Sequence, residues 1–443
     1  MNPRAIHMVG IGGAGMSGLA RLAVQAGYRV SGTDRADSAV LADLRALGVD
    51  ARAGHDGGAV PADARALVVS TAIGPDNPDV YIATARGLPI IHRADLLAEL
   101  MDEHRGLAVA GAHGKSTTSG MLVTALGTPS ACVGATIPGG GGTGAVWGTG
   151  PWFVAEADES DRSLLKLRPA AAILLNVDHD HHATYATIDE VEAVFATFVA
   201  ALPSDGVLIV GPDERARSVG AAARCPVQTV GDRAQDTWRI VRDRTTTVMG
   251  PHGPIPLELA VPGRHNAENA TCALALAVWC GVDAAIAADR LATFTGVGRR
   301  FEHKGTVGEI TVVDDYAHHP AELLATLTGA RERHPGRIIA VFQPHLYSRT
   351  KALTDEIATA LTAADVAIVT DIYAAREPHD PSIHATDVVA AVPNGRATYA
   401  SKLSDAADYV MQIAAPGDLI LTLGAGDITT LGQELVDRLQ RRS

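Results

Sequence analysis

The sequence has 443 residues, of which 47% are hydrophobic and 20% charged, so we expect two or three folded domains rather than a disordered chain. A formal net charge of −13 and an aromatic content of 4% argue against general binding of nucleic acid. The sequence shows no apolar run of membrane-spanning length, no basic-then-apolar signal at its start and no Cys-x-x-Cys pair among its four cysteines. We therefore expect a cytoplasmic protein with reduced thiols and no membrane partner.

The first candidate site is a glycine loop near the start of the sequence. A strand is predicted over residues 4–9 and a helix over 16–26, and between them Gly10, Gly12 and Gly15 have the spacing G-x-G-x-x-G. A second predicted strand, 28–33, ends on Asp34. This pattern is typical of dinucleotide binding. A UDP-sugar also carries a diphosphate and a ribose, so the pattern alone does not distinguish NAD from a UDP-sugar.

Two further strands are predicted over 66–70 and 89–91, and the first leads into Ser70, Thr71 and Ala72. We interpret this stretch as a ligand-facing loop at a strand end, with an ordinary turn as the alternative.

The second candidate site is a phosphate loop in the middle of the sequence. A buried strand is predicted over 106–110 and a helix over 119–126, and the residues between them are Gly111, Ala112, His113, Gly114, Lys115, Ser116, Thr117 and Thr118. In such a loop, backbone N–H groups and a lysine bind phosphate oxygens, and a serine hydroxyl binds Mg²⁺. Val109 stands where a full Walker A motif has its first glycine, and a glycine-rich turn with a chance lysine is the alternative.

A glycine run over 138–144 is interpreted as a linker-like loop or a flap over a substrate. An apolar strand predicted from 151 then delivers Glu156, Asp158, Glu159 and Asp161 at its carboxyl end. Glu156 emerges first and is our candidate Mg²⁺ carboxylate. The alternative is a solvated acidic turn, which we expect more for Glu159 than for Glu156.

A further buried strand, 170–175, leads into a loop with three histidines and two aspartates over 176–182. Zinc is one interpretation of this cluster, but zinc sites usually recruit cysteines or a more regular spacing. We favour one histidine beside Glu156 in a Mg²⁺ site. A helix follows over 188–201, and the stretch 207–262 is rich in strands and turns without evident site chemistry.

A long apolar helix is predicted to open at 263 and to run through 280. Asn266 and Asn269 are three residues apart, so both amides would face one ligand, with helix capping by Asn266 as the alternative. A Gly/Arg junction at 295–302 marks a domain boundary. After it, strands predicted over 310–313, 337–342, 366–370 and 419–423 end in polar loops.

These alternating strands and helices predict an α/β fold with three domains. We expect a Rossmann-like domain over 1–105, a central P-loop ATPase-type α/β domain over 106–297 and a Rossmann-like C-terminal domain over 298–443.

The motifs in this order resemble the Mur ligases over nearly the whole chain. Eight stretches carry the resemblance, namely 10–18, the phosphate loop, 156–161, 176–181, 263–269, 298–301 and the two loops 315–320 and 343–350. The form Gly15-Met16-Ser17-Gly18 resembles the branch of the family that adds L-alanine, rather than the murein-tripeptide recycling ligases. The resemblance implies ATP-dependent joining of L-alanine to the lactyl carboxylate of UDP-N-acetylmuramate through an acyl phosphate, with Mg²⁺, in peptidoglycan precursor synthesis. It leaves open whether the protein is a monomer or a homodimer.

The resemblance also implies roles for individual residues. The UDP-substrate site would comprise Gly12, Gly13, Ala14, Gly15, Met16, Ser17, Asp34, Ser70, Thr71, Ala72, His113 and Ser160. The ATP site would comprise Gly111, His113, Gly114, Lys115, Ser116, Thr117, Asn266, Asn269, Arg300 and Asp315. Metal would be held by Ser116, Glu156 and His181, and the amino acid by His318, His345 and Arg349. The implied catalytic residues are Lys115, Glu156, His318 and Arg349, with His318 orienting or deprotonating the amine.

The sequence departs from the family pattern at two places. Ala112 stands where the family usually has threonine, and Leu346 where it often has arginine. Many relatives also carry a carbamylated lysine in the central domain, yet no lysine lies between Lys166 and Lys304. Two rival functions remain, a folylpolyglutamate synthase-like ligase and a redox enzyme or NAD-sensing regulator built on the first glycine loop.

Overall fold

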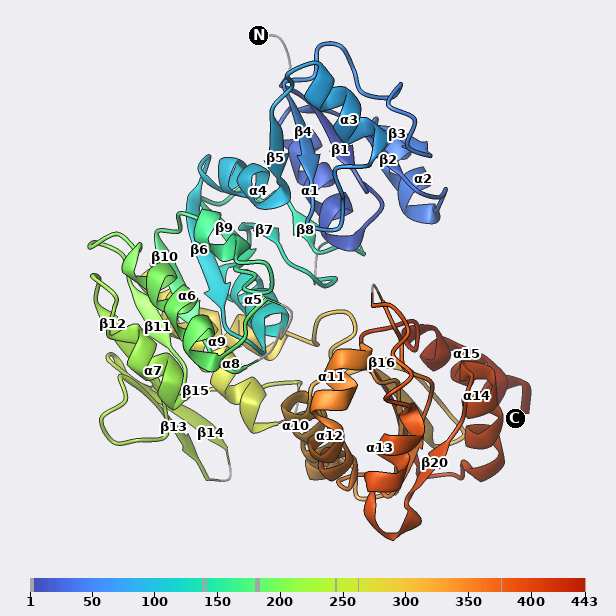
Figure 1. The fold of residues 1–443 in the computed structure, drawn as a ribbon. Helices are drawn as coiled ribbons and strands as arrows, with labels where there is room; N and C mark the ends of the chain where they lie inside the picture. The colour runs from blue at the N-terminus through green and yellow to red at the C-terminus, as the bar shows by residue number, and fades with distance from the viewer. Residues whose placement is uncertain are drawn as a thin grey trace. The chain divides into compact units, whose positions relative to one another are not determined.

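The computed structural model describes residues 4–137, 140, 142–179, 184–243, 245–261, 263–375 and 377–442 (Figure 1). The chain forms two compact units, the first made of Met1–Glu258 with Glu268–Phe294 and the second of Leu259–Ala267 with Thr295–Ser443. The first unit holds two β-sheets and the second holds one. Within these ranges, no helix combines the length and the hydropathy needed to cross a membrane.

The N-terminal sheet is parallel throughout, with strand order β3-β2-β1-β4-β5. Its elements are β1 (Ala5–Val9), α1 (Ala14–Gln25), β2 (Arg29–Asp34), α2 (Ala39–Ala46), β3 (Asp50–Ala53), β4 (Ala66–Val69), α3 (Pro78–Ala85), β5 (Ile90–His92) and α4 (Arg93–Met101). β1 lies between β2 and β4, so the strand order reverses there and the loop after β1 opens at a switch point.

The central sheet has ten strands in the order β15-β14-β13-β12-β11-β10-β6-β9-β7-β8. Its first part contains β6 (Arg105–Ala110), α5 (Lys115–Leu126), β7 (Ser130–Cys132), β8 (Ala145–Val146), β9 (Trp152–Glu156), the 3₁₀ helix η1 (Ser163–Lys166), β10 (Ala171–Leu174) and α6 (Ile188–Ala200). Its second part contains β11 (Leu208–Val210), α7 (Glu214–Gly220), β12 (Val227–Gly231), β13 (Trp238–Arg242), β14 (Thr246–Gly250), β15 (Gly253–Pro256), α8 (Arg264–Trp279) and α9 (Ala284–Ala292). β6 pairs in parallel with both β9 and β10, so the loops after these three strands emerge at one edge.

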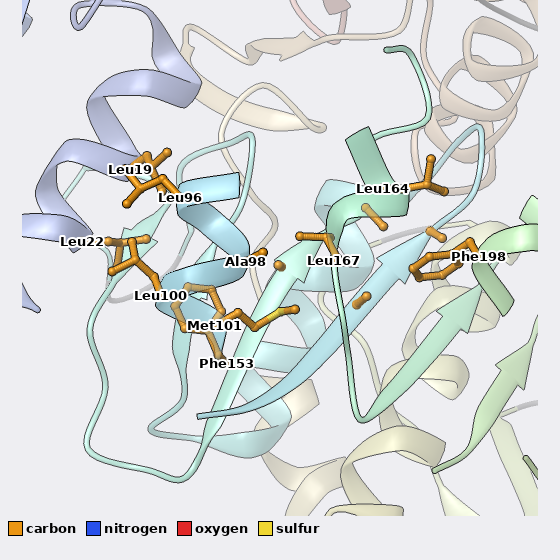
Figure 2. Close-up of a cluster of buried hydrophobic side chains, with 14 of the residues drawn as sticks. Leu19, Leu22, Leu96, Ala98, Leu100, Met101, Phe153, Leu164, Leu167 and Phe198 are labelled. Carbon is orange, nitrogen blue, oxygen red and sulfur yellow. The ribbon is translucent and has the colours of Figure 1, made fainter. Parts of the chain in front are cut away.

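Helix α4 joins the N-terminal sheet to the central sheet through a shared apolar core (Figure 2). It contacts α1 on one side and η1 on the other. Leu96 and Leu100 of α4 lie near Leu19 and Leu22 of α1, in a buried cluster that extends to Phe153 of β9 and Phe198 of α6. Because this apolar core is continuous, the glycine loop and the phosphate loop belong to one unit.

The second unit contains a six-stranded sheet in the order β16-β17-β21-β18-β19-β20, parallel except for β16. Its elements are β16 (Glu302–Val307), β17 (Ile310–Asp315), α10 (Pro320–Arg333), β18 (Ile338–Phe342), α11 (Tyr347–Ala352), α12 (Thr354–Leu361), β19 (Val366–Val369), α13 (Ala385–Ala391), η2 (Pro393–Gly395), β20 (Ala397–Tyr399), α14 (Leu403–Ile413), β21 (Leu419–Leu423) and α15 (Thr429–Arg442). One buried cluster joins the sheet to α10, α12 and α13, and another joins it to α14 and α15, so helices cover both faces (Figure 1).

The α/β class predicted from sequence is confirmed. The central sheet is mixed, because the pairs β13–β14, β14–β15 and β7–β8 are antiparallel. The helix after the phosphate loop begins at Lys115, not at 119, so Lys115, Ser116 and Thr117 form its first turn. The predicted helix began four residues too far along the sequence, because serines and threonines are poor helix interior residues and favour caps. In the glycine run, Pro138, Gly139 and Gly141 lie outside the described residues. Gly144 is in contact with the backbone of Val133, whose N–H donates to its carbonyl at 2.8 Å.

Candidate active site

The phosphate loop connects β6 to α5 through a turn that requires glycine at both ends. Gly111 and Gly114 have φ angles of 138° and 84°, which favour glycine. A Cβ at Gly114 would also lie 3.2 Å from the Asn269 amide oxygen, so this turn runs close to α8. No side chain caps α5, whose N-cap is Gly114. The first turn therefore presents backbone N–H groups and the positive end of a helix dipole, the arrangement that binds phosphate.

Lys115 is held inside this loop by carbonyls and by one carboxylate. Its Nζ donates to the carbonyls of Gly111 at 2.6 Å and Ala112 at 3.0 Å, and to Glu159 Oε1 at 2.9 Å. Burial is the largest single influence and would lower the pKa of Lys115, but the charge and hydrogen bond of Glu159, with the charges of Asp158 and Glu156, together hold the pKa above its ordinary value. Lys115 is therefore a half-buried cation in the first turn of α5. The contact to Ala112 uses its backbone, so this contact is kept despite the absent threonine hydroxyl.

Asn176, at the end of the strand that neighbours β6, fixes the loop. Its Oδ1 accepts the His113 N–H at 2.8 Å and its Nδ2 donates to the His113 carbonyl at 3.0 Å. The Ala112 N–H donates to the Asn176 carbonyl at 3.2 Å. Our site prediction omitted Asn176. Its place directly after a predicted parallel strand was the available signal.

The acidic loop after β9 (residues 156–161) reaches the phosphate loop. Glu156 pairs in register with Val109 of β6, which places the carboxylate at the same sheet edge. Glu159 is 2% exposed, so the alternative of a solvated turn is excluded for this residue. Burial is possible because Lys115 neutralises its carboxylate and Tyr185 Oη donates to its carbonyl at 2.5 Å. Ser160 lies in the same loop, where its N–H donates to Asp158 Oδ1 at 3.0 Å.

The histidine loop is described only in part. The His113 ring nitrogen Nε2 lies 3.3 Å from Asp178 Oδ2, and His179 Nε2 donates to the Tyr185 carbonyl across 3.2 Å. Asp180, His181 and His182 lie outside the described residues, so the assignment of His181 as a metal ligand stays a prediction.

The glycine loop of the N-terminal sheet is closed by Asp34. Gly10 has a φ of 74°, and the Gly12 N–H donates to Asp34 Oδ2 at 2.8 Å. A Cβ at Gly12 would lie 2.9 Å from this oxygen, so glycine is required here. The N-cap of α1, Gly13, has no side-chain cap, so this helix start also presents N–H groups to an anion.

The other UDP-site predictions fall around this loop. Ser70, Thr71 and Ala72 follow β4, and Ile73 after them lies near Gly10. The side chain of Met16 is 4% exposed and belongs to the hydrophobic core, so it meets a ligand only through its backbone. Ala14, Gly15 and Ser17 lie in the first turns of α1.

The second unit carries its own cluster at the carboxyl ends of β17 and β18. The rings of His318 and His345 have centroids 5.8 Å apart, and His345 stacks on Tyr373 at the same distance. Arg349 is 6% exposed and its Nη1 lies 3.4 Å from His345 Nδ1. His318 Nδ1 lies 2.9 Å from the Tyr316 carbonyl. A carbonyl only accepts, so Nδ1 donates in that bond and Nε2 is then the basic nitrogen.

Asp315 organises the loop that precedes this cluster. Its two carboxylate oxygens accept the N–H groups of Phe301 at 2.7 Å and Ala317 at 2.8 Å. Burial raises the pKa of Asp315 to about 6, although Arg300 opposes the shift. Arg300 lies 3.3 Å from Glu322 and over the Tyr316 ring. The structure thus shows Asp315 fixing backbone, and its contact with a ribose stays a prediction. Leu346, at the second departure from the family, has a φ of 70°, a strained value for leucine.

The two asparagines predicted to meet the nucleotide both lie in the first turns of α8. Asn266 is 6% exposed and belongs to the second unit, whereas Asn269 is 9% exposed and belongs to the first. Burial of an amide requires hydrogen-bond partners, so neither residue is a solvated surface asparagine.

Comparison with known proteins agrees with these motifs along the chain. Residues 5–105 match the "Mur ligase family, catalytic domain", residues 151–277 the "Mur ligase middle domain" and residues 299–426 the "Mur ligase, glutamate ligase domain". A UDP-N-acetylmuramate–L-alanine ligase of Streptomyces avermitilis is 42% identical, covering 98% of this chain and 97% of its own. One of Desulforamulus reducens is 41% identical, covering 99% and 98%. The crystal structure of UDP-N-acetylmuramate–alanine ligase from Thermotoga maritima superimposes with a TM-score of 0.82 at 26% identity, covering 99% of this chain and 100% of its own. The chain therefore belongs to the Mur ligase family.

Proposed function

We propose that this protein is an ATP-dependent ligase that joins L-alanine to the lactyl carboxylate of UDP-N-acetylmuramate, for peptidoglycan precursor synthesis. The observation that carries the proposal is the pairing, in one compact unit, of two anion-binding helix starts, α1 after the glycine loop and α5 after the phosphate loop. The UDP-N-acetylmuramate–L-alanine ligases that are 41–42% identical over nearly the whole chain support the choice of substrates.

The reaction needs activation, because a carboxylate is a poor electrophile. The lactyl carboxylate attacks the γ-phosphorus of ATP, ADP leaves and an acyl phosphate forms. Lys115 supplies fixed positive charge to the transferring phosphoryl group, and the N-cap Gly114 and the first-turn residues Ser116 and Thr117 of α5 supply backbone N–H groups. The amine of L-alanine then attacks the acyl carbon and phosphate leaves.

The second unit supplies the groups for the amino acid. Arg349 and His345 bind the carboxylate of L-alanine, and His318 orients or deprotonates its amine, which attacks only when neutral. Arg300, Asn266, Asn269 and Asp315 contact the adenine nucleotide. Leu346 has no charge to offer, so Arg349 alone supplies the guanidinium in this loop.

We propose Mg²⁺ as the metal. Ser116 in the first turn of α5 and Glu156 at the end of β9 offer a hydroxyl and a carboxylate, the oxygen donors that Mg²⁺ prefers. Gly134 leaves room for the Glu156 carboxylate, because a Cβ on this glycine would lie 2.9 Å from Glu156 Oε2. Together with His181, these residues would hold the ion, which supplies charge neutralisation for phosphate oxygens.

The rival functions predict different substrates. An NAD-dependent enzyme would give Lys115 and Glu156 no role in its reaction. A UDP-muramoyl ligase uses both, and it binds the diphosphate and ribose of UDP with the glycine loop, Asp34 and the Ser70 loop. A cytoplasmic location and the three-domain division at 105 and 297 are part of this proposal.

Phosphate release from ATP tests the proposal. It should be measured across UDP-muramoyl acceptors and amino acids, with the mass of the product as a second readout and Lys115→Ala as the inactive control. We expect phosphate release only with UDP-N-acetylmuramate and L-alanine together. Phosphate release with a pteroylglutamate and glutamate instead, or a change in NAD(P)H absorbance without ATP, would contradict it.

A further inference from the structure

Arg93 has no role in the proposed reaction, yet it lies between the glycine loop and the acidic loop that reaches the phosphate loop. It is the first residue of α4, after the N-cap His92. Its Nη2 donates to Asp158 Oδ2 at 2.8 Å and lies 3.7 Å from Asp161 Oδ2, so it bonds the acidic loop. Its side chain is about one-third exposed, at 31%.

The other end of the guanidinium faces the glycine loop. A Cβ placed on Gly15 would lie 3.2 Å from Arg93 Nη1, so the absence of a side chain at Gly15 lets Arg93 approach the first turn of α1. One small cavity is lined by Gly15, Arg93, Glu156 and Asp158 together. The residues that would bind a diphosphate and a metal therefore border one space.

The acidic loop connects this arginine to the phosphate-loop lysine. Asp158 bonds Arg93 and the next residue, Glu159, bonds Lys115 at 2.8 Å. Adjacent carboxylates of one loop thus bond the cations of the two sites.

We propose that Arg93 is a positioning residue that couples the UDP-substrate site to the phosphate loop through Asp158. The coupling rests on the proposed function, because that function assigns the two loops to their ligands. When ATP phosphates meet Lys115, the charge balance of Asp158 and Glu159 changes, and Arg93 transmits the change to the glycine loop at Gly15. A coupling of this kind is reciprocal between the two ligands.

A second ion pair in the same interface provides the matched control. Lys166 Nζ in η1 donates to Asp95 Oδ2 in α4 at 2.7 Å, so it also joins the two sheets of the first unit. Both side chains are about two-fifths exposed, at 42% and 38%. If Arg93 served only to dock α4, its loss and the loss of Lys166 would have similar consequences.

Calorimetry with UDP-N-acetylmuramate, in the absence and presence of a saturating non-hydrolysable ATP analogue, tests the proposal. We expect the analogue to change the Kd for UDP-N-acetylmuramate by about fivefold or more in the parent protein, within the usual range of coupling between sites. In Arg93→Met and in Asp158→Asn the factor should fall to near one, and the double variant should show no further change. Lys166→Met should keep the parent factor.

Arg93→Lys, which keeps the charge but not the forked geometry, should give an intermediate factor and guards against a misfolded methionine variant. Three results would overturn the coupling: the analogue leaves the Kd of the parent unchanged, Arg93→Met keeps the parental change in Kd, or Lys166→Met loses that change to the same extent. Each of these results would leave the ligase function intact. Failure of the parent to bind UDP-N-acetylmuramate at all would instead contradict the proposed function.

Discussion

Lys115 Nζ lies 2.9 Å from Glu159 Oε1, and the glutamate side chain is 3% exposed. The lysine that should bind ATP phosphates is thus already neutralised before any nucleotide arrives. An incoming triphosphate supplies negative charge to the same cation, so Glu159 is needed most when the site holds no nucleotide.

This relationship predicts that Glu159→Gln destabilises the protein more without ATP than with it. Removal of one partner of a buried ion pair leaves the other charge unpaired, at a cost of about 3–5 kcal/mol. Thermal unfolding with and without an ATP analogue measures the difference. Lys166→Gln breaks an exposed pair and should cost at most about 1 kcal/mol in both conditions. An equal loss of stability for Glu159→Gln in both conditions would contradict the prediction.

Glu156→Gln should lower turnover by about tenfold or more, partly relieved by raised Mg²⁺, because the amide keeps the volume but loses the charge of a metal carboxylate. Initial rates measured over a titration of Mg²⁺ check this expectation. A variant with parental rates at millimolar Mg²⁺ would exclude Glu156 from the metal site.

Arg349→Lys should raise the KM for L-alanine far more than the KM for ATP. A guanidinium binds a carboxylate with two parallel bonds, which an ammonium does not reproduce. Steady-state kinetics with each substrate varied in turn separates the two constants. Equal increases in both would indicate that Arg349 acts in a step common to both substrates.

A fourth prediction concerns stability in the N-terminal sheet. His7 is fully buried in β1, with Nδ1 2.8 Å from Ser31 Oγ and Nε2 4.0 Å from Asp79 Oδ2. Burial lowers its pKa to about 4; Asp79 and Asp50 oppose this shift, and Arg52 and His55 add to it.

The folded protein therefore binds this proton less readily than the unfolded chain, whose histidine titrates near 6.5. Stability should fall as the pH drops from about 6.5 to about 4, by about 3 kcal/mol from this group. Urea unfolding of the parent and of His7→Gln across this window isolates the contribution as the difference of the two curves. Curves that stay parallel would show that His7 does not cause the loss.

Much of the fold was predictable because each sheet is built from buried apolar strands that end in polar loops. The glycine loop, the phosphate loop and Glu156 were found at the carboxyl ends of their strands. The sequence could not show which charged residues, far apart along the chain, form ion pairs in the fold. A solvated turn was a stronger alternative for Glu159 than for Glu156 because an isolated acid is usually solvated, whereas Lys115, 44 residues earlier, makes burial of Glu159 favourable. Arg93 was missed for the same reason, since its partner Asp158 lies on another sheet's loop.

The last prediction concerns a lysine that this chain lacks. Many Mur ligases carry a carbamylated lysine in the central domain that binds a second Mg²⁺, but no lysine occurs between Lys166 and Lys304. Helix α6 (Ile188–Ala200), where the family would place it, offers Glu190 and Glu192 instead. Glu190 Oε2 accepts the Ala186 N–H at 3.0 Å, and Glu192 accepts from Arg215 at 2.7 Å, so both carboxylates are held by neighbouring groups.

Activity should therefore be indifferent to CO₂, since a carbamate needs a neutral lysine amine. The enzyme should be assayed after degassing at mildly acidic pH, where carbamates decompose, and again after bicarbonate is restored. We expect the same rate in both conditions and an unmodified mass for the intact protein. Lys166→Arg, which removes the lysine amine nearest the histidine loop in sequence, should behave as the parent does. A reproducible rescue by bicarbonate, or a mass increase of one carbamate on any lysine, would show that another amine has taken over the missing group's role.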